Sequence, residues 1–128
     1  MGQHKPHEDL IKGLLGQLKE IFDSSEQAVY LYLDDHHRAC NKKFASLLGY
    51  KSPQEWMNQK VSFTELFVDE KSRTDLVSAY HNAMKKLIGS AFHVTWKTRR
   101  GKQVKTRVIL VPITYNGEIF ALHFISKV

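Results

Sequence analysis

Four consecutive residues, 34–37, carry two carboxylates followed by two imidazoles. Such groups bind divalent metals and transfer protons, so this segment raises the question of a metal or acid–base site. Adjacent side chains in an extended turn point in different directions and rarely converge on one ion. The segment also follows an alternating apolar run at residues 28–33. We therefore expect a solvated corner after a strand, without a metal.

The rest of the chain offers few groups for catalysis. It contains no nucleophile motif, Gly-rich phosphate loop or metal-ligand spacing. His93, His123 and Glu118 could act as acid or base in the pocket of a small α+β enzyme with a cone-shaped fold, such as an isomerase or hydratase. No aspartate follows residue 90 to pair with these histidines. We predict a protein that is not an enzyme, with this small enzyme as the alternative.

Length and composition indicate one globular domain. The chain has 128 residues, 42% of them hydrophobic, which is enough for a core without disulfide bonds. Its one cysteine, Cys40, excludes an internal disulfide and is typical of a reducing compartment. No apolar run reaches the roughly 18 residues of a membrane span, and the polar beginning is unlike a signal peptide. We expect a soluble, cytoplasmic protein.

Positive charge is concentrated in one segment. The net charge is +6, and residues 97–107 contain six basic residues and no acid. Such a segment could bind nucleic acid or an acidic partner. However, it lacks regularly spaced aromatic residues for base stacking, and strand alternation would scatter several charges over two faces. A nucleic-acid-binding module is therefore a further alternative, and we do not expect a nucleic-acid partner.

The first element is an amphipathic helix over residues 7–23. Its apolar residues recur at spacings of three and four, which is the pattern of one helical face. Four of them form two short heptads: Ile11, Leu14, Leu18 and Ile21. Gly13 and Gly16 weaken the helix, so packing must stabilise it. Two interpretations remain open: the helix caps its own domain, or the four residues form a dimer interface.

Local signals place the next elements. Residues 28–33 predict a strand and residues 38–40 a second, shorter strand. Asn41 predicts the N-cap of a helix that ends near Gly49, and Ser52 predicts the N-cap of another short helix that begins with a proline.

A longer helix and three strands complete the chain. The helix spans about residues 69–88 and should end at Gly89. Its predicted apolar face consists of Leu76, Val77, Tyr80, Ala83, Met84 and Leu87. Strands follow at residues 90–98, 103–115 and 118–128, the last two joined by an Asn-Gly hairpin turn. This order predicts an α+β domain built on an antiparallel sheet.

The stretch LDDHHRACNKKFASLLGY, residues 33–50, combines a strand, an Asp-containing turn, a second strand, an Asn-x-x-Phe step and a helix ending in Leu-Gly-Tyr. In this order it resembles the PAS domain family. The matching positions in this stretch are Asp34 or Asp35, Asn41, Phe44, Leu48, Gly49 and Tyr50. The later hairpin, with Gly101 in its turn and Pro112 in its second strand, and the closing strand also resemble the family.

The resemblance implies a five-stranded antiparallel sheet with strand order 2-1-5-4-3 and helices packed on one face. It covers residues 24–128 and leaves residues 1–23 as the N-terminal amphipathic helix. Members of the family bind small molecules or cofactors between sheet and helices, or pair with other PAS domains, and most are sensors.

The resemblance also suggests ligands. Some PAS domains bind haem through a histidine of the long helix, where this chain has His81, so haem is one possible cofactor. The flavin-binding branch needs a cysteine within an Asn-Cys-Arg-Phe motif on a helix, whereas Cys40 precedes Asn41, so we do not expect flavin. The candidate pocket residues are Tyr80, His81, Met84, Trp96 and His123.

These features together predict a stand-alone PAS-like sensory and signal-transduction domain. It should bind a small molecule or a signalling protein partner and transmit the signal through helix packing or through a homodimer. The residues of the predicted dimer interface are those of the heptads in the first helix.

Overall fold

Five antiparallel strands form one sheet in the order β2-β1-β5-β4-β3. The computed structural model describes residues 4–59 and 62–128 and, in the first helix, side chains from Glu8 onward. The strands are β1 (Ala28–Asp34), β2 (His37–Cys40), β3 (Ser90–Lys97), β4 (Gln103–Tyr115) and β5 (Glu118–Lys127). This order confirms the predicted topology and excludes the cone-shaped alternative fold.

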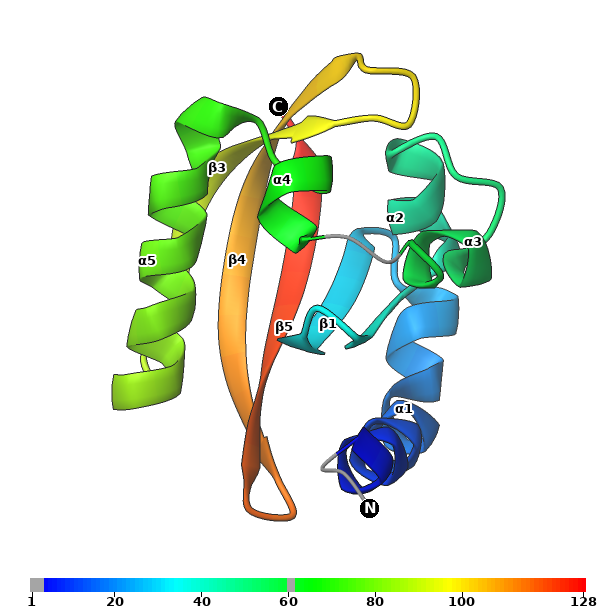
Figure 1. Cartoon of the computed structure of the whole chain (residues 1–128), viewed down its shortest axis with the longest axis vertical. Helices are drawn as coiled ribbons and strands as arrows, with labels where there is room; N and C mark the ends of the chain where they lie inside the picture. Colours follow the sequence, from blue (N-terminus) through cyan, green and yellow to red (C-terminus); the bar gives the residue numbers. More distant parts are fainter. Residues whose placement is uncertain (1–3, 60–61) are drawn as a thin grey trace.

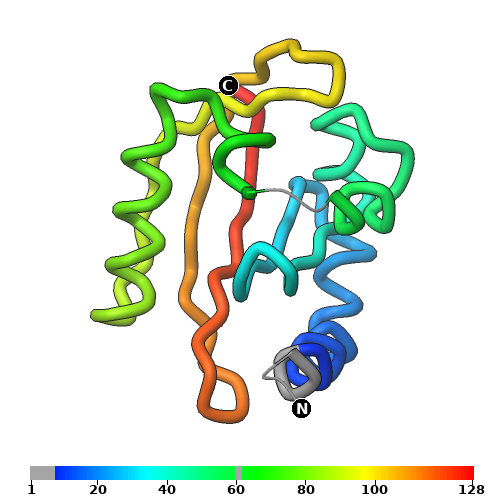
Figure 2. The backbone as a smooth tube through the Cα atoms, viewed as in Figure 1, coloured from blue at the N-terminus to red at the C-terminus, as the bar shows by residue number. Residues whose placement is uncertain are grey.

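The described part of the chain also contains five helices. They are α1 (His4–Ser24), α2 (Lys42–Leu47), α3 (Pro53–Met57), α4 (Phe63–Phe67) and α5 (Glu70–Lys86). In Figure 1, α5 runs beside β3 and β4, whereas α1, α2 and α3 lie on the opposite side of the view. The blue part of α1 and the end of β5 lie at opposite ends of the long axis (Figure 2). No helix in the described ranges is long and apolar enough to cross a membrane.

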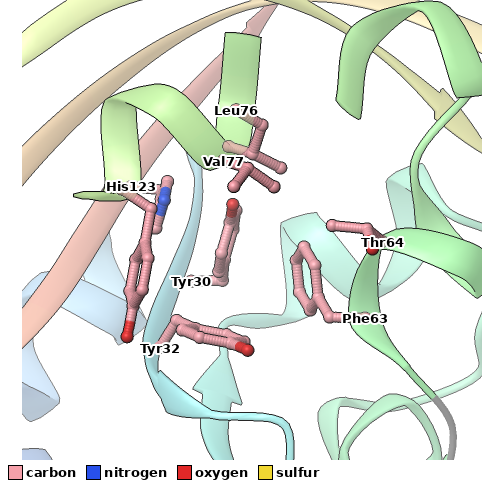
Figure 3. Close-up of a pocket in the computed structure, with 8 residues that line it drawn as sticks. Tyr30, Tyr32, Phe63, Thr64, Leu76, Val77 and His123 are labelled. Carbon is pink, nitrogen blue, oxygen red and sulfur yellow. The ribbon is translucent and has the colours of Figure 1, made fainter. Parts of the chain in front are cut away.

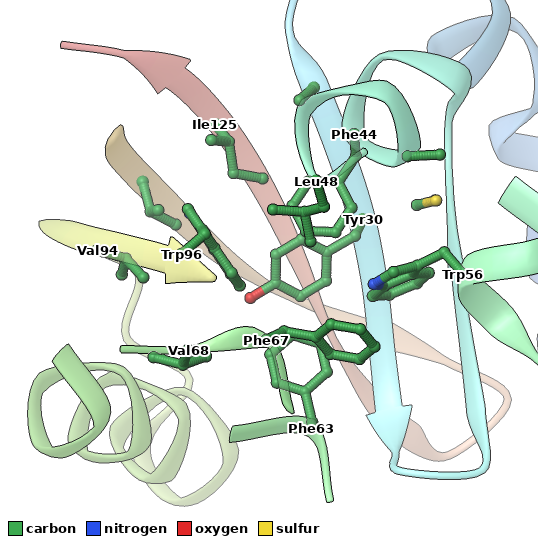
Figure 4. Packing of buried hydrophobic residues seen from close by; sticks show 14 of the residues in the cluster. Tyr30, Phe44, Leu48, Trp56, Phe63, Phe67, Val68, Val94, Trp96 and Ile125 are labelled. Atoms are coloured by element: carbon green, nitrogen blue, oxygen red, sulfur yellow. The ribbon is translucent and has the colours of Figure 1, made fainter. Parts of the chain in front are cut away.

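Helices α2 to α5 cover the inner face of the sheet. Their apolar residues pack with those of the strands into an aromatic core, and Figure 4 shows Tyr30 in the middle of it. The Tyr30 ring lies 4.8 Å from Phe44, 5.4 Å from Phe63 and 5.6 Å from Trp96, measured between ring centroids. Each such pair adds about 0.5–1.5 kcal/mol beyond the burial of its apolar area.

Helix α1 covers the β1 and β5 part of the outer face. Three of the four predicted heptad residues, Ile11, Leu14 and Leu18, are buried there. Their partners on the sheet are Val29, Leu31, Phe120 and Leu122. Ile21 is 40% exposed and is not part of this contact. In this structure α1 is therefore docked on the sheet of its own domain, and a dimer interface through all four residues would require α1 to leave the sheet.

The end of α5 differs from the prediction. The helix stops before Gly89, because Leu87 at its C-cap has a left-handed backbone with φ of 54°. Gly89 is needed instead because the backbone of Leu110 lies close to it. A Cβ atom at position 89 would lie 2.9 Å from the carbonyl oxygen of Leu110. Leu87 and Val77, expected on the apolar face, are 57% and 38% exposed.

The predicted capping motif is confirmed, and it also joins α2 to β1. The Asn41 side-chain oxygen accepts hydrogen bonds from the backbone N–H groups of Phe44 and Val29, both at 3.0 Å. Its amide nitrogen donates to the Gln27 carbonyl, also at 3.0 Å. Phe44 is fully buried in the core, so this side chain fixes where α2 packs on the sheet.

Candidate functional site

A small cavity of about 70 Å³ lies between the inner face of the sheet and the helices α4 and α5. It is lined by Tyr30, Tyr32, Phe63, Thr64, Leu76, Val77, Tyr80 and His123 (Figure 3). Roughly 10–15 Å³ of such space is enough for one water molecule, so this cavity has room for a few waters or for a small ligand.

Strand alternation and strand pairing place the polar residues of the cavity. Tyr30 and Tyr32 are two residues apart on β1, so both face the helices. His123 on β5 is the direct pairing partner of Tyr30. Their rings stack with centroids 3.9 Å apart and an angle of 8° between the planes. The adjacent strands therefore bring a phenol and an imidazole together at the wall of the cavity.

Tyr30 and His123 each present a buried polar atom without a partner. Tyr30 is only 1% exposed and His123 only 2%. Among the described residues, neither the Tyr30 hydroxyl nor His123 Nδ1 has a hydrogen-bond partner. Burial lowers the pKa of His123 to about 3 and raises the pKa of Tyr30 well above its usual range. Both groups are therefore uncharged at neutral pH.

The other two tyrosines of the cavity are anchored by the backbone and by Asp35. The Tyr32 hydroxyl donates to the Asp35 carboxylate at 2.6 Å, and the Tyr80 hydroxyl donates to the Leu33 carbonyl at 3.2 Å. Burial raises the pKa of both phenols, and the bond to Asp35 raises that of Tyr32 further. Tyr32 and Tyr80 thus form a fixed wall.

The lining of the cavity is suited to binding a ligand rather than to acid–base catalysis. His123 is its only imidazole, and none of its lining residues is a carboxylate that could pair with His123. A general acid or base works best with a pKa near the working pH, whereas the pKa of His123 is far lower. These features give no support to the predicted alternative of an isomerase or hydratase.

Two of the five predicted pocket residues, Tyr80 and His123, line the cavity. The other three do not. His81 is exposed, because one residue of a helix turns the side chain by about 100° away from Tyr80. Trp96 is fully buried in the core, where its Nε1 donates to the Thr106 hydroxyl at 2.8 Å. Met84 packs beside the small cluster of Ala79, Ala83, Leu110 and Ala121.

Six lining residues were not among the predicted pocket residues: Tyr30, Tyr32, Phe63, Thr64, Leu76 and Val77. Leu76 and Val77 had been predicted only as part of the apolar face of the long helix. The two tyrosines had a usable signal, since β1 alternates and its inward residues could have been matched with His123 on β5. Phe63 and Thr64 had none, because the position of α4 depends on tertiary packing.

The cavity does not fit the large cofactors considered from the sequence. Its volume is far below that of a haem or a flavin, and the proposed haem ligand His81 lies outside it. Cys40 is buried at the end of β2 and does not line the cavity. Burial raises the pKa of the Cys40 thiol to about 12, so it is a poor nucleophile.

The corner at residues 34–37 is less solvated than expected. His36 is exposed, but β2 begins at His37, which is buried and lies 2.8 Å from the Asp34 carboxylate through its Nδ1. Burial of Asp34 would raise its pKa, but hydrogen bonds from the His37 side chain and the His36 N–H outweigh this and lower it. Within the described ranges, no three His, Cys, Asp or Glu residues are grouped as a metal site would require.

The buried Arg38 has a structural role that the sequence did not indicate. Its guanidinium donates to the carbonyls of Asp35, Trp56 and Gln59 and stacks 4.8 Å above the Trp56 ring. These contacts tie α3 and the segment after it to β2.

The basic residues of the segment 97–107 lie on both sides of the sheet. Lys105 and Arg107 are two residues apart on β4 and both are exposed, so they share the outer face. At the base of the hairpin, Lys97 donates to the Glu65 carbonyl at 2.5 Å, and Arg99 lies 3.5 Å from the Glu55 carboxylate. These four charges are thus divided between the outer face and the helix-covered side of the sheet, as strand alternation had suggested.

Comparisons with known proteins identify the fold through structure alone. No model of a known protein family matches the sequence, and no curated protein matches it. Solved structures do match. The PAS domain of an HTR-like protein from Haloarcula marismortui has a TM-score of 0.63 and 19% identity over 97% of this chain and 99% of that one.

Two further structures agree with it. A PAS domain from a two-component sensor histidine kinase has a TM-score of 0.66 and 10% identity, covering 91% of this chain and 99% of its own. The PAS-B domain of Drosophila melanogaster Cycle, with bound ethylene glycol, has a TM-score of 0.65 and 11% identity, covering 79% and 99%. The sheet order, the capping motif and these likenesses lead to one conclusion: the chain has the fold of a PAS domain.

Proposed function

We propose that the chain is a sensory signalling domain in which a small molecule enters the cavity and changes the docking of α1. The main observation is that β1 and β5 contact both regions. Tyr30 and His123 line the cavity on one face of the sheet. Their neighbours in sequence, Val29, Leu31 and Leu122, contact α1 on the other face. A displacement of these strands would therefore also move the surface on which α1 docks.

Two solved structures support a role of this kind. The PAS domain from a sensor histidine kinase belongs to a signalling protein, and the Cycle domain binds a molecule as small as ethylene glycol. A cavity of about 70 Å³ is compatible with ligands in that size range.

The mechanism requires two states with different ligand affinity, since a ligand shifts an equilibrium only through such a difference. In one state α1 is docked on the sheet, as in this structure. In the other, α1 has moved and presents Ile11, Leu14, Leu18 and Ile21. These heptad residues would then pair with a second copy or with a signalling partner. A homodimer through α1 is therefore a feature of the released state in this proposal.

Xenon provides a test that does not depend on knowing the natural ligand, because it enters apolar protein cavities. We would record methyl NMR spectra of Leu- and Val-labelled protein under xenon pressure. The proposal predicts shifts at Leu76 and Val77 in the cavity and also at Leu31 and Leu14 across the sheet. Shifts confined to the cavity would refute the coupling to α1, and a spectrum without shifts would refute the binding site.

A further inference from the structure

Two neighbouring hollows lie on either side of the first turn of α2, and none of their lining residues lines the cavity beside α4 and α5. The first hollow, of about 570 Å³, lies between the end of α1 and the starts of α2 and α3. The second lies between α2 and the end of β5, and its two parts, of about 300 and 360 Å³, share Leu47 and Lys127. Because Lys43 lines both hollows, they form one continuous surface, which we call the α2 groove.

The α2 groove carries a positive charge. The charged residues of its lining are four lysines and two acids: Lys19, Lys42, Lys43, Lys127, Asp23 and Glu26. Lys19 pairs with Asp23 at 2.7 Å. The other three lysines are exposed, and none of them is in an ion pair with a described residue. Lys43 donates to the Glu26 carbonyl at 3.3 Å, which uses only one of the three donors of its ammonium group. The groove therefore offers several cationic donors to a negatively charged partner.

The walls of the groove are partly apolar. Phe22 and Pro53 line the first hollow, and Leu47 and Ile125 line the second. Phe22, Pro53 and Leu47 are partly exposed, so a ligand that covers them would remove apolar surface from water. A partner that fits this surface carries acidic groups beside apolar ones.

An acidic protein segment matches these features better than nucleic acid does. A phosphate backbone carries a charge at every nucleotide, so it would meet Asp23 and Glu26 as well as the lysines. Single-stranded bases bind mainly by stacking on aromatic rings, and Phe22 is the only aromatic residue in the described lining of the groove. An extended peptide alternates its side chains, so carboxylates can face the lysines while apolar side chains face the walls.

We infer that the α2 groove is a docking site for an acidic, extended segment of a partner protein. The carboxylates of the segment contact Lys42, Lys43 and Lys127. Its apolar side chains lie against Phe22 and Leu47. This surface goes beyond the proposed function, since it includes neither the cavity nor the heptad residues of α1. Binding there can be tested whether or not a ligand enters the cavity.

Two matched peptides provide the probes. The acidic peptide is DEFEDLED, and the neutral peptide NQFQNLQN has nearly the same shape without the carboxylates. Fluorescence anisotropy of labelled peptides should show binding of the acidic one that weakens as salt is added, because exposed charges are screened. The neutral peptide should bind at least about fivefold more weakly. In ¹⁵N-labelled protein, the acidic peptide should shift the backbone amides of Lys43, Leu47 and Lys127.

Two charge-reversal variants test the position of the site. Lys42→Glu/Lys43→Glu should weaken binding of the acidic peptide at least about fivefold. It should not unfold α2, because acidic residues are favourable in the first turn of a helix. The control is Lys85→Glu/Lys86→Glu, which makes the same charge change at two exposed residues of α5 outside the groove. This control should retain the affinity, and an equal loss in both variants would mean that only net charge matters and that the assigned site is wrong.

Duplex DNA of mixed sequence is the third probe. If DNA binds more tightly than the acidic peptide and loses its affinity in Lys42→Glu/Lys43→Glu, the groove is a nucleic-acid site and the assigned partner is wrong. If the acidic and neutral peptides bind equally, or if the amides of the groove do not shift, the docking site itself is overturned. Neither result affects the xenon test, so failure of this inference and failure of the proposed function are distinguishable.

Discussion

At the scale of single residues, His123 should make the stability of the protein depend on pH. Burial lowers its pKa in the folded state to about 3, from an ordinary value of 6.5. Between these values the unfolded chain binds a proton that the folded chain does not. The stability is therefore fully present above pH 6.5 and is lost as the pH falls, by up to about 1.4 kcal/mol per pH unit.

Urea unfolding at a series of pH values from 7 downward would measure this slope. His123→Leu should flatten it, whereas the control His93→Leu, which changes an exposed residue of β3, should retain it. An equal slope in the native protein and in His123→Leu would mean that other groups cause the acid sensitivity.

Two buried hydroxyl groups should respond to removal in opposite ways. Tyr30→Phe removes a hydroxyl without a described partner, so ligand-free stability should stay equal or rise by about 1 kcal/mol. Thr106→Val removes the acceptor of Trp96 Nε1 and the donor to the Val94 carbonyl, so it should cost about 1–3 kcal/mol. Chemical denaturation of both variants would measure these changes in the free energy of unfolding. A clear loss of stability in Tyr30→Phe would reveal a partner for its hydroxyl.

At the scale of elements, the two helix caps should differ in their importance. Asn41 bonds three backbone groups and connects α2 with β1, whereas the Ser52 side chain caps α3 through the Glu55 N–H. Asn41→Ala should cost about 2–3 kcal/mol, and Ser52→Ala about 1 kcal/mol. Equal costs in urea unfolding would show that the link from Asn41 to β1 contributes nothing beyond capping.

Features that depend on neighbouring residues could be predicted from the sequence. The caps at Asn41 and Ser52 and the left-handed turn at Asn116 and Gly117 are confirmed, because each follows from a residue's own side chain or backbone freedom. The α5 terminus was predicted incorrectly, since Gly89 is required by its approach to Leu110. That approach is a tertiary contact, and no local pattern reports it.

The residues of the cavity could likewise be predicted only in part from the sequence. The stripe of α5 correctly suggested that Tyr80 faces inward, and the central position of the last strand correctly singled out His123. The pattern could not show that Trp96 is enclosed by the core or that Tyr30 stacks on His123. These depend on the pairing of β1 with β5, which are far apart in the sequence.

At the scale of the whole molecule, α1 should be a detachable layer on the sheet. Leu14→Glu/Leu18→Glu places two carboxylates in its buried contact with β1 and β5. Because a buried charge without a partner is costly, α1 should leave the sheet while the strands stay folded. Hydrogen exchange should then show rapid exchange of α1 amides and continued protection of β4 and β5.

The matched control is Lys12→Glu/Gln17→Glu, since both of these residues are exposed on α1 and neither is a heptad residue. It should preserve the protection of the helix. Global unfolding of the Leu14→Glu/Leu18→Glu variant would show that α1 is an essential part of the core, and unchanged protection of α1 would show that other contacts stabilise it.

The central claim is that the cavity and the α1 contact are coupled through β1 and β5. Coupling between two sites is reciprocal, so if filling the cavity changes the docking of α1, releasing α1 must change affinity at the cavity by the same factor. The most direct measurement is the xenon affinity of Leu14→Glu/Leu18→Glu beside that of the Lys12→Glu/Gln17→Glu control, followed at the Val77 methyl groups. We predict a change of about fivefold or more in the first variant and none in the control. Equal affinity in the two variants, with α1 released in the first, would contradict the account.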